Sequence, residues 1–279
     1  TGATGVQFTT FPALWTATSA ASFSTNPVAA TREYEVCFKC HSSFAFGGTP
    51  PTAPNLGDSA MQQTDVAMEF NPNNRSMHPV VSPLGSAAGT LAPKSLPATY
   101  LLAPWNVNVG TQTMTCTDCH NTDSASPAAQ GPHGSAVRFL LAGTNKAWPY
   151  TVAGATSGTL FQMSNSGTGF GTSNGLFCRN CHSNPGTGTG NPNTAHGQFN
   201  GQHSGNAIGT CVRCHIRIPH GGKVSRLMVT SPNAPARYTV SGQTLNFTRF
   251  VKNSTYSGSA WFGTTCSRHS GGGTGGEAW

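Results

Sequence analysis

The chain has few charged residues and few of the large aliphatic residues that usually build a protein core. Only 8% of its 279 residues are charged and 36% are hydrophobic, whereas it contains 34 glycines and 19 prolines. Burying so few apolar side chains offsets little of the conformational entropy that is lost on folding. The composition therefore argues against an ordinary globular core and predicts mostly irregular structure for the bare polypeptide.

Long apolar runs and clusters of basic residues are also missing. No stretch approaches the length of about 18 apolar residues that a transmembrane helix needs, so we predict no membrane span. Lysine and arginine number 15 against 8 for aspartate and glutamate. They are scattered along the chain, which argues against a nucleic-acid-binding patch.

Cysteine, in contrast, follows one strict pattern. The spacing C-x-x-C-H occurs four times and leaves one of the nine cysteines over. It is typical of a covalently attached haem, because the two thiols add to the haem vinyl groups and the adjacent histidine binds the iron. The predicted attachment residues are Cys37 and Cys40, Cys116 and Cys119, Cys178 and Cys181, and Cys211 and Cys214. The predicted proximal ligands of these first to fourth motifs are His41, His120, His182 and His215.

Two other uses of paired cysteines were weighed. A zinc ribbon could be drawn from the cysteines of the third and fourth motifs, and eight cysteines could form four disulfides in an extracellular protein. Both leave the histidine that follows every pair without a purpose. The motifs therefore favour four covalently attached c-type haems as the cofactors.

A six-coordinate haem iron needs a second axial ligand. His78 follows a predicted turn and precedes a proline, and His133 and His220 each stand between a proline and a glycine. Glycine at such a place lets the backbone approach a flat ring closely. We predict His78, His133 and His220 as distal ligands, together with one of His196 and His203, between which the sequence does not choose.

The supply of histidine favours electron transfer over catalysis. Six histidines lie outside the motifs, His269 included, and four would make every haem bis-histidine. Iron with both axial positions filled cannot bind a substrate, so we predict no catalytic residues and no enzyme activity. Eight haem propionates would also offset the formal charge of +7, which further weakens the case for a nucleic-acid partner.

The sequence suggests three regions packed around the haems. Residues 1–36 form an N-terminal arm, which either packs on a neighbouring subunit or is a solvated leader. A short helix at 30–37 leads from this arm into the first motif. Residues 37–222 form the tetrahaem core, which is mostly coil with a short helix at 59–70. Residues 223–279 form a β-hairpin, with strands at 238–240 and 245–251, and a glycine-rich tail. Cys266 is interpreted as an unpaired thiol, with an intersubunit disulfide or a metal site shared with His269 as the alternatives. The third and fourth motifs are closest in sequence, so their haems are expected to be neighbours.

The ligand motifs resemble those of a known family. Arg75-Ser-Met-His78-Pro-Val follows the first motif, Gly131-Pro-His133-Gly the second, and Ile218-Pro-His220-Gly the fourth. These residues are similar to the OmcE-type extracellular tetrahaem cytochromes, which polymerise into filaments called cytochrome nanowires. The resemblance covers roughly residues 30–230. It implies a continuous chain of bis-histidine haems, little regular secondary structure, and one distal histidine supplied by the adjacent subunit.

Together these observations predict an extracellular electron-transfer protein at the cell surface. Thr1-Gly2-Ala3 looks like the start of a mature chain whose secretion signal has been removed. The expected partners are other copies of the chain, in a homopolymer, and redox proteins or extracellular electron acceptors. A monomeric periplasmic shuttle with the same haems is the alternative, and a multihaem reductase is a third reading.

Overall fold

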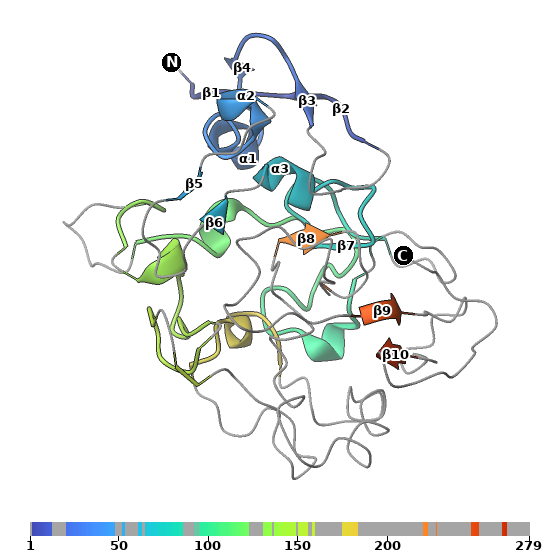
Figure 1. The fold of residues 1–279 in the computed structure, drawn as a ribbon, viewed down its shortest axis with the longest axis vertical. Coiled ribbons are helices and arrows are strands. Elements are labelled where there is room, and N and C mark those ends of the chain that lie inside the picture. Colours follow the sequence, from blue (N-terminus) through green and yellow to red (C-terminus); the bar gives the residue numbers. More distant parts are fainter. Residues whose placement is uncertain are drawn as a thin grey trace.

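A computed structural model shows the chain as short helices and strands joined by long loops (Figure 1). The coarse expectation from composition is confirmed, since the described part is mostly coil. No helix in that part is long and apolar enough to cross a membrane. The structure describes residues 2–12, 21–47, 52–53, 61–62, 65–85, 93, 95–122, 131–135, 137–148, 150–155, 158–159, 175–183, 220–222, 227, 247–250 and 264–266.

The helices are one turn long or little more. The α-helices are α1 (Glu33–Cys37), α2 (Ser43–Phe46) and α3 (Val66–Glu69). The 3₁₀ turns are η1 (Ala98–Tyr100), η2 (Cys116–Asp118), η3 (Arg138–Leu140) and η4 (Phe177–Asn180). Three of these elements, α1, η2 and η4, carry the first cysteine of a C-x-x-C-H motif.

The strands pair two by two, always antiparallel. Near the N-terminus β1 (Thr4–Gly5) pairs with β4 (Val28–Ala29), and β2 (Phe8–Thr10) with β3 (Ser22–Phe23). The short β5 (Thr52–Ala53) pairs with β6 (Met61–Gln62). One pair joins distant parts of the chain, β7 (Ser76–Met77) with β8 (Gly221–Gly222). The last pair is β9 (Phe247–Phe250) with β10 (Thr264–Cys266).

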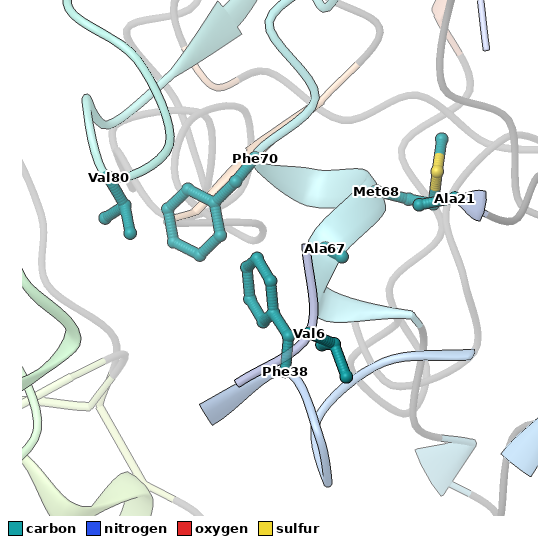
Figure 2. Packing of buried hydrophobic residues seen from close by; sticks show 7 residues of the cluster. All are labelled: Val6, Ala21, Phe38, Ala67, Met68, Phe70 and Val80. Carbon is teal, nitrogen blue, oxygen red and sulfur yellow. The ribbon is translucent and has the colours of Figure 1, made fainter. Parts of the chain in front are cut away.

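One buried cluster lies between α1, α3 and the N-terminal strands. Figure 2 shows Phe38 and Phe70 close together, with Val6 beside Phe38 and Met68 directed toward Ala21. The ring centroids of Phe38 and Phe70 are 6.4 Å apart. Phe38 directly follows Cys37 in the chain, so this cluster packs against the segment that carries the first motif.

The N-terminal segment packs on its own chain in the described residues. Val6 is fully buried, and its N–H donates to the carbonyl of Glu35 at 2.9 Å. Gly5 lies so close to α1 that a Cβ there would be 2.6 Å from the Cβ of Glu35. The expected arm or leader at 1–36 is thus tied to the first motif, and contact with a neighbouring subunit stays a prediction.

Two helices begin later than the sequence pattern indicated. The predicted helix at 30–37 starts at Glu33, because the Glu35 carboxylate accepts hydrogen bonds from the N–H groups of Thr31 and Arg32 at 2.7 and 3.2 Å. The prediction of a helix over 59–70 was wrong in its first half, since 61–62 form β6 and only Val66–Glu69 are helical. In the C-terminal region β9 lies within the predicted hairpin strand at 245–251 and pairs with β10. The other predicted strand of the hairpin, 238–240, lies outside the described residues.

Asp65 connects the start of α3 to the rest of the buried cluster. Its two carboxylate oxygens accept hydrogen bonds from the N–H groups of Ala67 and Ala21, at 3.1 and 3.3 Å. Burial raises the pKa of this carboxyl, and the hydrogen bonds oppose the shift. We expect Asp65→Ala to lower the free energy of unfolding by about 2–3 kcal/mol, because a helix cap and a buried acceptor are lost together. Denaturant titration measures this loss of stability. If Asp65→Ala destabilised the protein less than Asp65→Asn does, the result would contradict this role of Asp65.

Candidate functional site

The three described C-x-x-C-H motifs share one backbone turn. In each, the N–H of the second cysteine and the N–H of the histidine both donate to the carbonyl of the first cysteine. The histidine bonds measure 3.0, 2.8 and 2.8 Å for His41, His120 and His182. One tight turn therefore presents two thiols and an imidazole as a unit. The fourth motif, with Cys211, Cys214 and His215, lies outside the described residues.

The first and second motifs are in direct contact. The Sγ atoms of Cys37 and Cys116 and a carboxylate oxygen of Glu33 all lie within 4.8 Å of one another. A hydrogen bond between the two thiols lowers the pKa of Cys37 and raises that of Cys116, which burial raises further. Glu33 also accepts from the N–H and the hydroxyl of Thr117, at 2.9 and 2.7 Å. Helix α1 is thereby joined to η2.

The second and third motifs are also neighbours. Burial raises the pKa of Cys119 to about 12, and Cys181 is the nearby group that adds most to this shift. The segment after η3 links the two motifs, because the N–H of Ala142 donates to the carbonyl of Cys119 at 2.9 Å and Asn180 donates to the carbonyl of Ala142 at 3.3 Å. The second motif therefore lies between the first and the third.

Each of these three motif histidines faces a histidine from a distant part of the chain. The first pair has nearly parallel rings, at 18°, whereas the rings of the other two pairs are inclined at 62° and 64°. None of the partners lies in the loop that directly follows its own motif. The pairs, with ring-centroid separations, are His41 with His133 (6.0 Å), His120 with His220 (5.8 Å), and His182 with His78 (6.3 Å).

The second pair shows the protonation of its rings most clearly. The Nδ1 of His120 lies 2.7 Å from the carbonyl oxygen of Phe139, which can only accept, and the Nδ1 of His220 lies 2.6 Å from the Glu69 carboxylate. Burial lowers the pKa of both imidazoles to about 4, which favours the neutral rings. With one proton on each Nδ1, two unprotonated Nε2 atoms face each other at 3.5 Å. Two facing lone pairs are the arrangement that a bound metal ion requires.

Strands β7 and β8 place two of the partner histidines side by side. The N–H of His78 donates to the carbonyl of His220 at 2.8 Å, next to the register pair of Met77 and Gly221. From this common position the two rings reach different motifs, the third and the second. Gly221 makes the approach feasible, since a Cβ there would overlap the carbonyl oxygen of Glu69.

His133 sits in a tight turn. The N–H of Gly134 donates to the carbonyl of Gly131 at 3.1 Å, and Gly131 has a φ of +105° that other residues rarely adopt. The turn presents His133 to the first motif, 92 positions earlier in the chain. The remaining candidates, His196, His203 and His269, lie outside the described residues.

Sequence reasoning missed the groups that surround these histidines. Glu69 and Glu33 contact predicted ligand and attachment residues, although each was only one of eight acidic residues without a motif. Within the described ranges, the Nε1 of Trp148 and an Nη of Arg179 are buried donors that have no acceptor. Arg179 lies inside the third motif, and Trp148 and Cys178 pack against the same small cluster, formed by Ala147 and Leu176. The rarity of acidic residues was the one signal that could have singled out these two glutamates.

No family model, curated protein or solved structure matches this chain.

Proposed function

We propose that the chain is a tetrahaem c-type cytochrome that carries electrons along a row of closely packed, bis-histidine haems. The observation that carries the proposal is the set of three facing histidine pairs, each of which joins a motif histidine to a distant one. Haem c, when bound, supplies a one-electron redox centre whose potential depends on its axial ligands and surroundings.

The spacing within the pairs suits one metal ion between two rings. Metal–imidazole nitrogen bonds are about 2 Å long, so two nitrogens on opposite sides of a metal lie about 4 Å apart. The Nε2 atoms of His120 and His220 are 3.5 Å apart, and the centroid separations of the other two pairs are similar to theirs. The two cysteines of each motif share a turn with its histidine, so they can form thioethers with the same ring that this histidine binds.

Two buried donors offer sites for the acidic edge of a haem. The unpartnered Nη of Arg179 and Nε1 of Trp148 both need an acceptor, because burying an unpaired polar group costs about 1–3 kcal/mol. Haem propionates are carboxylates, and arginine binds carboxylates with good geometry. These two residues would hold a propionate beside the third motif.

Contacts between motifs favour transfer from one ring to the next. Cys37 and Cys116 bring the attachment points of the first and second rings together, and Cys119 and Cys181 do the same for the second and third. The polypeptide would thus hold neighbouring rings in the close range that fast electron hopping needs. An iron bound by both histidines of a pair would have no open position for a substrate, which favours electron transfer over a reductase.

The finer proposal is an extracellular filament of this chain, and its ground is the resemblance of the ligand motifs to those of OmcE-type cytochromes. The fourth haem would take His215 and one of His196 and His203, with one distal histidine of the assembly supplied by the adjacent subunit. A monomeric periplasmic shuttle would use the same haems and the same histidine pairs.

Spectra of the purified ferric protein test the haem proposal. We expect four haems per chain from the pyridine haemochrome, a mass increased by four haems under denaturing conditions, and a fully low-spin spectrum that cyanide and nitrite do not change. A protein without covalent haem would refute the proposal, and a high-spin fraction would favour a reductase. Electron microscopy of shed material then separates the filament from a monodisperse monomer.

A further inference from the structure

Glu69 is a fully buried carboxylate at the end of α3. One of its oxygens lies 2.6 Å from the Nδ1 of His220, the residue that faces His120. Acidic residues are rare in this chain, with eight in total, and a buried carboxylate is costly unless it is paired. Packing alone therefore does not explain why a carboxylate lies behind the imidazole that faces His120.

Several contacts fix this pair in place. Asn74 donates from its side chain to the carbonyl oxygen of Glu69 at 3.0 Å, which holds the end of α3. Phe70 covers His220, with ring centroids 4.9 Å apart. Gly221 packs against the backbone of Glu69. The carboxylate, which is fully buried, and the imidazole, which is 23% exposed, consequently meet in a fixed geometry with little water to screen their interaction.

The two imidazoles of this pair have unequal partners. His120 donates from Nδ1 to a neutral backbone carbonyl, that of Phe139, whereas His220 donates to a carboxylate. Hydrogen bonds to an ionised acceptor are roughly twice as strong as those to a neutral one. A carboxylate behind a ligating histidine also raises the basicity of the ligand. His220 is therefore the stronger electron donor of the two.

We propose that Glu69 is a positioning residue that lowers the reduction potential of the haem carried by the second motif. Its hydrogen bond gives the His220 imidazole partial imidazolate character, which stabilises ferric over ferrous iron. The inference rests on the proposed haem function. Because the second motif lies between the first and the third, the potential of its haem sets the energy of an internal step for electrons that pass along the row.

The test is Glu69→Gln in the holoprotein. Glutamine can still accept the Nδ1 hydrogen bond through its side-chain oxygen, but it carries no charge, so the haem should stay low-spin. In a spectroelectrochemical titration we expect one of the four components to move to higher potential. A tenfold change in its reduction equilibrium constant corresponds to about 59 mV for one electron, which matches the lower end of the 10- to 100-fold effects that loss of a partner behind a metal ligand has on metal affinity.

Asp65→Asn is the matched control, because it removes the charge of another buried carboxylate that flanks the same helix but has no contact with His220. It should leave all four potentials in place. If Glu69→Gln does not fold, the same titration is made on Glu69→Asp, because its shorter side chain withdraws the carboxylate from the Nδ1 of His220. An upward shift of one component supports the inference. Four low-spin haems with unchanged potentials would overturn the inference about Glu69 but not the proposed function. A protein without covalent haem would overturn both.

Discussion

Replacing His133 with alanine is expected to convert the haem of the first motif from low-spin to high-spin. His133 faces His41 with nearly parallel rings at a centroid distance of 6.0 Å. Without it the iron would keep one strong axial ligand, and the ferric spectrum should show about a quarter of the haem as high-spin. Resonance Raman or magnetic circular dichroism measures that fraction.

Added imidazole should reverse the change, because it can occupy the position that the missing side chain leaves. Ser135→Ala is the control from the same loop, since Ser135 accepts a hydrogen bond from the N–H of Val137 and contacts no motif histidine in the described residues. Its spectrum should stay low-spin. A His133→Ala protein that remained entirely low-spin would show that another residue binds the first iron.

Replacing Gly221 with alanine is expected to destabilise the protein strongly and to disturb two haems at once. A Cβ at this position would lie 2.7 Å from the Cβ of Met77 and would overlap the carbonyl oxygen of Glu69. Overpacking of this kind costs about 1–3 kcal/mol. Relief of the overlap must move β8 away from β7, and with it the two histidines that lie side by side at one end of this strand pair, His78 and His220.

The expected readout is a lower denaturant midpoint together with a high-spin fraction from the second and third motifs. Gly85→Ala is the matched control, because a Cβ at Gly85 meets nothing within 4 Å. A surface change of this kind should alter the free energy of unfolding by no more than about 0.5 kcal/mol. If both variants unfolded at the same midpoint, the close approach of β8 to α3 would not matter for stability.

The sequence indicated which residues make up the candidate site better than it indicated which of them lie together. Local spacing was enough to single out the motif cysteines and histidines, because C-x-x-C-H closes a single turn that needs no tertiary context. The histidines flanked by proline and glycine, His133 and His220, were singled out in the same way. The motif that each of these two histidines faces was not predictable. His133 faces the first motif and His220 the second, and each contact brings together residues about 100 positions apart in the chain.

The secondary structure could be predicted only in its general character. Low aliphatic content correctly indicated coil, but helical propensity over 59–70 did not anticipate β6 or the cap at Asp65. Hydrogen bonds that backbone N–H groups donate to a few buried carboxylates decide where these short elements begin. The role of each carboxylate depends on its contacts, such as those of Glu35 with Thr31 and of Asp65 with Ala21. The pattern of apolar residues in the sequence does not indicate these contacts.

The order of the histidine pairs along the chain has a topological consequence. The spans from 41 to 133, from 78 to 182 and from 120 to 220 overlap, so that each begins inside the one before it and ends outside it. Bonds through iron would make these spans three overlapping closed loops. Closing a loop of about 100 residues removes roughly 4–5 kcal/mol of denatured-state entropy in the chain-entropy model. Overlapping closures of this kind would restrict the unfolded chain from the first motif to His220, and this restriction would favour the folded state of a chain with few aliphatic side chains.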